Sequence, residues 1–253
     1  MPETRRLQHQ ITSGFIHVVT DDKTQIRAFW AHPVTGGPFP GLILAHDDWG
    51  LSAVGRTQAH RFAEIGYYVI VPDLFEGQLA NSQIEADSLE LRFKEYAPTK
   101  VVGGLTALET HPKCNSKLAV VGWDLGAELA MQLAIERNDI MAAVALSGDL
   151  SAFLGDLERL QCPLLVVMGG EDPITQRSEQ ALRQALNTVD ERSQVIVYPE
   201  AEHAFYNHLS SAYKAEAAED AQTKILDFLE MHQGKPPAPD DAVPGRFRHG
   251  RVY

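Results

Sequence analysis

The chain has 253 residues with 44% hydrophobic content, and its 22 basic and 34 acidic residues give a formal net charge of −12. This length accommodates one large α/β domain or two small ones, each with a buried core. The net negative charge argues against nucleic acid or an anionic membrane surface as a partner, because either polyanion is repelled over most of the exterior.

The chain starts with MPETRRLQHQ, which is polar, and no segment approaches the roughly 18 apolar residues of a membrane-spanning helix. We therefore expect a cytoplasmic protein that makes no membrane contact. Cys114 and Cys162 are the two cysteines of the chain. Two cysteines form neither a disulfide framework nor a zinc site, so we expect both to be buried structural thiols.

Apolar runs of strand length alternate with segments of helical periodicity along most of the chain. This alternation is typical of βαβ units and predicts a mainly parallel sheet of about eight strands with helices on both faces. The predicted strands cover residues 15–20, 25–32, 41–46, 68–72, 118–123, 141–147, 164–169 and 194–198. Residues 21–24 are too few for a crossover helix, so the first two strands should form a hairpin at the sheet edge.

The predicted helices cover residues 54–65, 88–109, 127–138, 178–186 and 212–232. The last of them repeats apolar side chains at helical spacing, so one of its faces should pack against the sheet. We expect residues 1–233 to form a single domain. Residues 234–253 contain four prolines and no apolar period, which predicts an irregular tail. Its basic cluster could dock on the protein itself or on a second subunit of a homodimer, or could belong to a disordered end; it comprises Arg246, Phe247, Arg248, His249 and Arg251.

A candidate catalytic turn lies within LAVVGWDLGAELA, residues 118–130. Its G-x-D-x-G pattern, between an apolar strand and a helix, is that of the nucleophile elbow of α/β-hydrolases with Asp124 at the centre. Gly122 and Gly126 give the turn the space that it needs. The same turn aims the backbone amide of Leu125 at an oxygen bound beside Asp124, as in an oxyanion hole.

An acid and a histidine follow in the order that a catalytic triad on this fold requires. Asp172 ends the strand LLVVMGG, and His203 ends the segment VIVYPEAEH. Both therefore lie at carboxyl ends of strands, where α/β sheets place their sites. His203 should bind Asp172 through one ring nitrogen and face Asp124 with the other.

The loop in LILAHDDWGL is the third part of the predicted site. In this fold it supplies the second oxyanion-hole amide, which here comes from Asp48. Asp47 adds a further acid. If it approaches Asp124 closely, repulsion and burial should keep one of the two carboxyls protonated near neutral pH. The aromatic residues expected along the pocket are Trp49, Trp123 and Phe205.

Three separated stretches resemble the dienelactone hydrolase family of α/β-hydrolases. They are LILAHDDWGLSAVGRTQAHRFAEIGYYVIVPDLFEGQ, then VVGWDLGAELA with GGEDPIT, and finally YPEAEHAFYN followed by AYKAEAAEDAQTKILDFL. Together they span about residues 41 to 230. The resemblance implies one domain without a large lid, hydrolysis of a small ester or lactone, and a triad of Asp124, Asp172 and His203, with Asp47 matching the family's acidic residue after the third strand.

The sequence departs from the family pattern in two places. Asp124 stands where the family usually has cysteine, sometimes serine, and Glu76 and Gly77 follow the PDL turn where the best-known members carry a substrate-binding arginine. The second departure argues against the dienelactone itself as substrate. The sequence contains no phosphate loop, dinucleotide fingerprint or metal-ligand cluster, so it implies no cofactor and no metal.

The sequence leaves several roles open for Asp124. A carboxylate can displace halide or open an epoxide at a saturated carbon, giving an ester that histidine-activated water cleaves. Hydrolases known for that chemistry resemble one another in carrying a helical cap, for which DLSAFLGDLERLQCP leaves no room. The carboxylate could instead act as a general base on water, cap the following helix, belong to a non-catalytic binding protein that keeps the pocket, or be a deliberate replacement of a cysteine or serine.

Overall fold

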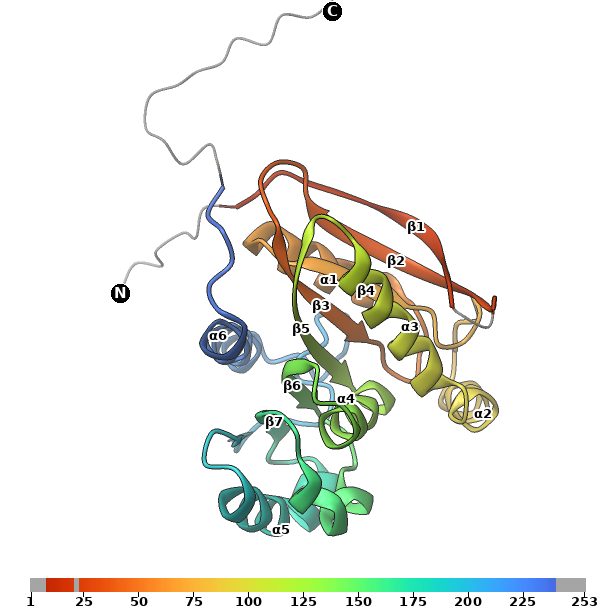
Figure 1. The fold of residues 1–253 in the computed structure, drawn as a ribbon. Coiled ribbons are helices and arrows are strands. Elements are labelled where there is room, and N and C mark those ends of the chain that lie inside the picture. The colour runs from red at the N-terminus through yellow and green to blue at the C-terminus, as the bar shows by residue number, and fades with distance from the viewer. Residues whose placement is uncertain (1–7, 21–22, 240–253) are drawn as a thin grey trace, which may run out of the picture.

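The computed structural model describes residues 8–20 and 23–239, which contain one eight-stranded sheet. Its strands are β1 (Ile11–Val19), β2 (Gln25–Pro33), β3 (Phe39–Ala45), β4 (Tyr68–Pro72), β5 (Cys114–Trp123), β6 (Ile140–Leu146), β7 (Leu164–Gly169) and β8 (Gln194–Tyr198). Their order is β1-β2-β4-β3-β5-β6-β7-β8 (Figure 1). The pairs β1–β2 and β2–β4 are antiparallel and all others are parallel, which confirms the predicted sheet with its edge hairpin.

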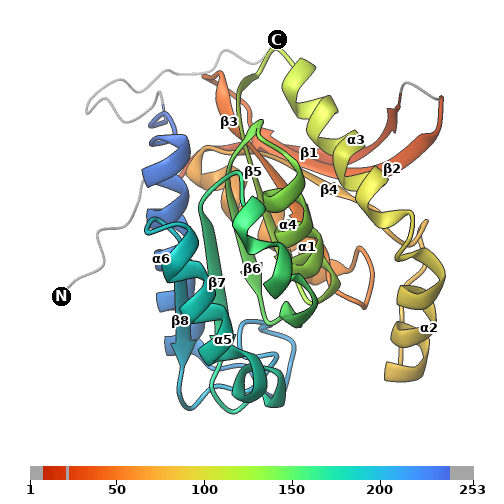
Figure 2. The ribbon, with the colours of Figure 1, turned by 60° about the horizontal axis from the view of Figure 1, so that its bottom comes forward.

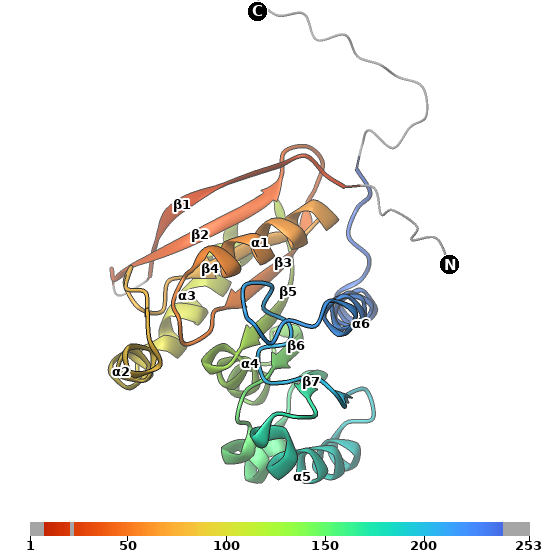
Figure 3. The same ribbon diagram turned by 180° about the vertical axis from the view of Figure 1, so that it is seen from behind.

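Helices cover both faces of this sheet. They are α1 (Ala53–Ile65), α2 (Gln83–Phe93), α3 (Ala97–Thr110), α4 (Leu125–Glu136), α5 (Pro173–Val189) and α6 (Ala215–Gln233), with a 3-10 helix, η1, at Ser151–Arg159. Helices α3, α4 and α5 lie on one face (Figures 1 and 2), where their side chains belong to the same core cluster as Ile43 and Val120. Helices α1 and α6 lie on the other face (Figure 3), where their side chains belong to the same core cluster as Leu42 and Val121. Neighbouring strand residues point to opposite faces, so central strands covered on both sides are apolar throughout.

The predicted helix at 88–109 is wrong, because α2 and α3 are separate helices. The apolar spacing continues from Phe93 through Ala97 to Val101, and all three side chains are buried in the same core cluster. Pro98, however, lies in the first turn of α3. A proline has no amide for a preceding helical turn but fits the start of a helix, so the chain begins a new helix there.

The start of α5 differs from the prediction, whereas the segment between β6 and β7 agrees with it. Helix α5 begins at Pro173, earlier than predicted, because the Asp172 carboxylate caps it by accepting a 2.9 Å hydrogen bond from the amide of Ile174. The segment between β6 and β7 holds only η1, so no large cap domain is present in the described residues. The carboxyl ends of the central strands therefore remain uncovered by a lid.

The remaining expectations fall partly outside the described residues. The basic cluster at 246–251 lies beyond them, and the domain boundary at residue 233 stays a prediction. Cys114 and Cys162 are buried and unbonded, as expected. Within residues 8–20 and 23–239, no helix combines the length and the apolar character needed to cross a membrane.

Candidate active site

Asp124 forms the turn between β5 and α4 and has a strained backbone, with φ 51° and ψ −114°. Two glycines make this turn possible. A Cβ on Gly122 would lie 1.9 Å from the carbonyl oxygen of Gly126, and one on Gly126 would lie 2.0 Å from that of Ala45. The Asp124 side chain makes no capping hydrogen bond to α4, so the helix-cap role is excluded. Backbone strain without a cap is typical of a functional position.

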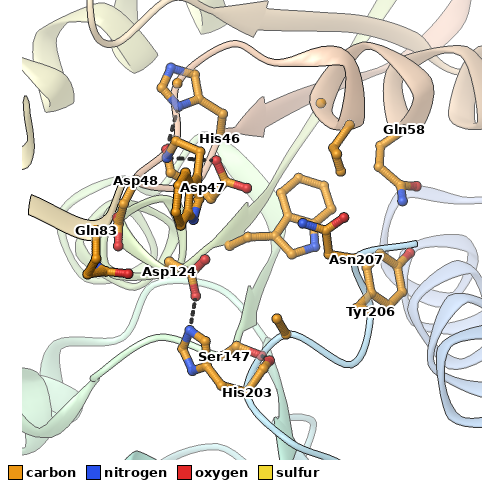
Figure 4. A pocket seen from close by; sticks show the side chains of 16 residues that line it. His46, Asp47, Asp48, Gln58, Gln83, Asp124, Ser147, His203, Tyr206 and Asn207 are labelled. Carbon is orange, nitrogen blue, oxygen red and sulfur yellow. Dashed lines mark hydrogen bonds and ion pairs between the residues drawn. The ribbon is translucent and has the colours of Figure 1, made fainter. Parts of the chain in front are cut away.

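Asp172 and His203 reach Asp124 from the ends of β7 and β8. The Nε2 atom of His203 lies 2.8 Å from Asp124 Oδ1 (Figure 4). Its Nδ1 atom lies 2.7 Å from Asp172 Oδ2. The hydroxyl of Ser147, just after β6, donates a 2.8 Å hydrogen bond to the backbone oxygen of His203 and so holds the loop. The side chain of Asp172 is 2% exposed, that of Asp124 is 21% exposed and that of His203 is 41% exposed. An imidazole thus bridges one buried carboxylate and one that reaches the surface.

This arrangement favours a positively charged His203. Its contact with Asp124, followed by its contact with Asp172, raises the pKa of His203 to about 10, although burial opposes the shift. In the resting protein the imidazole therefore carries a proton on both nitrogens. It can give up a proton during a reaction, but it becomes a base only when a carboxylate beside it loses its charge.

The loop after β3 presents two further carboxyl groups. Asp47 accepts a 3.0 Å hydrogen bond from the amide of Trp49 within its own turn. Asp48 accepts a 3.1 Å hydrogen bond from the amide of Leu125, the group expected to form half of an oxyanion hole. Burial first, and then the charge of Asp124, raises the pKa of Asp47 and that of Asp48 to about 7. Below about pH 7, the carboxyl groups of Asp47 and Asp48 are therefore mostly protonated.

The two sets of groups meet in one cavity of about 230 Å³ (Figure 4). Its wall includes Asp47, Asp48, Trp49, Gln58, Trp123, Asp124, His203 and Tyr206. A cavity of this size admits a small molecule, and the aromatic rings can exclude water from part of it. No group of three or more histidine, cysteine, aspartate or glutamate side chains within the described residues is arranged to hold a metal.

One expected pocket residue is not there. Phe205 has 0% exposure and packs in the core, with its ring 5.3 Å from that of Tyr198. The loop after β8 turns this side chain under the sheet, and the next residue, Tyr206, lines the cavity in its place. The sequence interpretation also missed Gln58, which is 2% exposed on α1. A polar residue on the buried face of an amphipathic helix was the available signal.

Comparison with known proteins identifies the family. The profile described as "Dienelactone hydrolase family" matches residues 26–233. The chain belongs to the dienelactone hydrolase family. It is therefore a hydrolase by family. The carboxymethylenebutenolidase of Pseudomonas putida is 28% identical to it over 211 residues, which cover 79% of this chain and 89% of the relative.

Solved structures show the same fold. A dienelactone hydrolase-like promiscuous phosphotriesterase from metagenomic libraries superposes with a TM-score of 0.78 at 22% identity, covering 88% of this chain and 98% of the other. The dienelactone hydrolase of Anabaena variabilis superposes with a TM-score of 0.67 at 18% identity, covering 88% and 99%. At these identities the likeness concerns the fold alone.

Within this family member, the turn after β4 also has a local role. Glu76 Oε1 lies 3.2 Å from the Nζ of Lys100, which also donates to the carbonyl of Leu74 at 2.9 Å. Glu76 therefore pairs with a lysine of α3. This turn thus carries a paired carboxylate where the family resemblance implies an arginine.

Proposed function

We propose that this dienelactone hydrolase family member hydrolyses a small uncharged substrate with the carboxylate of Asp124 as nucleophile. The observation that carries the proposal is the contact chain from Asp124 through His203 to Asp172, with distances of 2.8 and 2.7 Å, at the wall of a 230 Å³ cavity. Such a chain supplies a nucleophile, a proton carrier and a group that orients it. The substrate class that fits best is an epoxide.

The first step follows from the charged state of His203. An oxygen of Asp124 attacks a ring carbon, a carbon–oxygen bond of the epoxide breaks, and the freed oxygen takes the proton from His203 Nε2. This step leaves a neutral ester on Asp124 and a neutral imidazole. The alkoxide that leaves an epoxide carbon is a strong base and needs that proton, whereas a departing halide does not. A halide ion would also be repelled by the carboxyl groups of Asp47 and Asp48 when these are ionised.

The second step uses the change of charge that the first creates. The ester no longer carries the negative charge that is the largest cause of the raised pKa of His203, so this pKa falls and the imidazole becomes a base. His203 takes a proton from water while the hydroxide adds to the ester carbon. Collapse of the adduct frees the second alcohol oxygen, which takes the remaining carboxyl proton. The diol leaves, and Asp124 and His203 return to their initial charges.

Ester or lactone hydrolysis is the second candidate, favoured by membership of the family and by relatives such as the Pseudomonas putida carboxymethylenebutenolidase. In that reaction the pair of Asp124 and His203 would activate water as a general base. Direct attack by Asp124 on an ester carbonyl would give an anhydride, a less favourable intermediate.

A labelling experiment separates the two candidates. A panel of uncharged epoxides, esters and lactones is first screened, with haloacids as the charged comparison. A single turnover in oxygen-18 water should then place the label in Asp124, and Asp124→Asn should lower diol formation by at least about 10³-fold. Label that appears only in the product would contradict the nucleophile role, and loss of ester cleavage in both Asp124→Asn and His203→Ala would then support the water route.

A further inference from the structure

The carboxyl group of Asp48 occupies a place that an acyl-transfer site usually leaves free. Its Oδ1 atom accepts a 3.1 Å hydrogen bond from the backbone amide of Leu125, the residue that follows the nucleophile position. In an elbow of this kind that amide stabilises negative charge on oxygen during the reaction. The contact joins two segments that are 77 residues apart in the chain, the loop after β3 and the first turn of α4. A side chain of this protein thus occupies the amide, and Asp48 and Asp124 line the same cavity (Figure 4).

The charges around Asp48 are mostly negative. Asp124 faces it from the elbow, Glu90 from α2 and Glu128 from α4. The nearby cation, Lys94, is engaged by both glutamates, with its Nζ atom 2.9 Å from Glu90 and 2.8 Å from Glu128. No ion pair of Asp48 occurs within the part of the chain that the structure describes. An anionic Asp48 would therefore be isolated among like charges and would repel any oxyanion formed beside it.

We propose that Asp48 is the oxyanion-stabilising donor of this site: as a carboxylic acid it keeps Oδ1 on the Leu125 amide and donates its O–H to the oxygen that becomes negative on the Asp124 ester. The proposal rests on the nucleophile role given to Asp124 above. The proton stays on Asp48, which only donates a hydrogen bond, so no further reactant is needed. A carboxylic acid held neutral by an apolar or negative environment can serve as such a donor.

The arrangement has a specific consequence for the pH dependence of activity. Burial and the charge of Asp124 bring the pKa of Asp48 to about 7. Below that pH the acid form is present, and above it the donor is replaced by a carboxylate that opposes the reaction. On the ester, where the charge of Asp124 is absent, the pKa of His203 falls and loss of its proton promotes the step, so His203 causes no alkaline decline. Burial and the charges of Glu90 and Glu128 still raise the pKa of Asp48 on the ester, so kcat should fall as the pH rises toward about 7. Asp47 does titrate there, since its pKa is also about 7, and has to be tested separately.

The test compares pH profiles of kcat in three variants. Asp48→Asn preserves an acceptor for Leu125 and a donor for the oxyanion but cannot ionise. We expect it to keep kcat within about threefold of wild type at acidic pH and to lack the alkaline decline. Asp48→Ala removes the donor and should lower kcat at least about tenfold at acidic pH, with a smaller difference from wild type above pH 7, where the wild-type donor is itself ionised. Asp47→Asn, the matched control, should retain the alkaline decline whatever its effect on the absolute rate.

A surface variant adds a graded readout. Glu90→Gln removes one of the charges that raise the pKa of Asp48, so its alkaline decline should begin at lower pH than in wild type. A rise in kcat on Asp48→Ala at acidic pH would overturn the proposal, because it would identify the Asp48 contact as a block on the amide. A decline that persists in Asp48→Asn but disappears in Asp47→Asn would overturn it as well.

A measurement without turnover keeps this test separate from that of the nucleophile. Carbon-13 carboxyl spectra of the protein labelled at aspartate should contain a resonance that titrates near pH 7 and is absent in Asp48→Asn. If the Asp48 carboxyl instead titrates below about pH 5, the proposal fails even when Asp124 is labelled as expected. If Asp124 is not labelled but the Asp48 resonance behaves as described, the nucleophile role fails and the neutral carboxyl on the Leu125 amide stands.

Discussion

The two walls of the cavity hold the same kind of side chain in opposite electrostatic surroundings. On one wall, Asp124 and Asp172 each contact the imidazole of His203, at 2.8 and 2.7 Å. On the other wall, Asp47 and Asp48 accept hydrogen bonds from backbone amides only, within the described residues. The first wall therefore stabilises a positive charge, and the second stabilises neutral acids. Surroundings that shift the pKa values of neighbouring titratable groups in different ways determine which group acts as acid and which as base.

The largest effect on the rate of hydrolysis is expected from removing the imidazolium of His203, which the two carboxylates of the first wall contact. His203→Ala should lower the rate of hydrolysis by about 10²- to 10⁴-fold, because the variant has neither the proton for the leaving oxygen nor the base for water. Asp172→Asn should have a smaller effect on the same rate, since it alters the orientation of the imidazole but leaves it in place. Equal rates for His203→Ala and the wild type, measured as diol formation, would show that the first wall is not catalytic.

The second largest effect is expected where the elbow packs against the loop after β3, at Gly126. A Cβ at Gly126 would lie 2.0 Å from the carbonyl oxygen of Ala45 and 2.9 Å from that of His46, so Gly126→Ala must separate the elbow from the loop after β3. We expect a loss of about 3 kcal/mol in the free energy of unfolding, measured by urea denaturation. Gly155→Ala is the control, because no atom lies within 4 Å of the Cβ position there, and it should change this free energy by less than about 1 kcal/mol.

The first wall was accessible to sequence reasoning and the second only in part, because the sequence predicted Asp47 as a further acid near Asp124 but not the hydrogen bond between Asp48 and Leu125. The positions of Asp124, Asp172 and His203 follow from where apolar strands end, since the carboxyl ends of parallel strands meet at one edge. The contact between Asp48 and Leu125 depends on which way a loop side chain turns, and no periodicity reports that. The interpretation assigned Asp48 only a backbone amide, and it placed Phe205 in the pocket although the loop turns this ring into the core.

The helix boundaries had the same limitation. The apolar spacing from Leu89 to Leu105 continues across the break between α2 and α3, so the pattern of burial alone predicts one helix. The backbone constraint of Pro98 decides where the second begins. Patterning therefore identifies the faces that are buried, and local chain chemistry, read residue by residue, locates the turns.

The walls should also contribute separately to the pH dependence of stability. The folded protein holds the proton of Asp47 up to about pH 7, whereas the unfolded chain releases it near 3.8, so the stability that this group adds is lost between these values. The contribution of His203 is complete below pH 6.5 and is lost as the pH rises through about 10. Asp47→Asn should reduce the slope in the lower range, to which Asp48 also contributes, and His203→Gln should flatten the upper range. The changes should be on the order of 1 kcal/mol, smaller for the partly exposed His203.

Urea denaturation at a series of pH values measures both effects, and each variant is the control for the other. A single variant that flattens both ranges would mean that the two walls titrate as one coupled group. Unchanged slopes in both variants would contradict the shifted pKa values of Asp47 and His203.

The smallest effect concerns a side chain on the cavity wall that belongs to neither group of charges. Gln58 is 2% exposed, and its two polar side-chain atoms have no hydrogen-bond partner among the described residues. Gln58→Leu should therefore raise the free energy of unfolding by about 1 kcal/mol, because it removes an unsatisfied buried amide at similar volume. The same variant should raise KM if the amide binds substrate, with little change in kcat.

Gln132→Leu on the exposed face of α4 is the control and should alter stability by less than about 0.5 kcal/mol. Destabilisation by Gln58→Leu would mean that ordered water already satisfies the amide, and the cavity would then discriminate substrates by charge and shape alone.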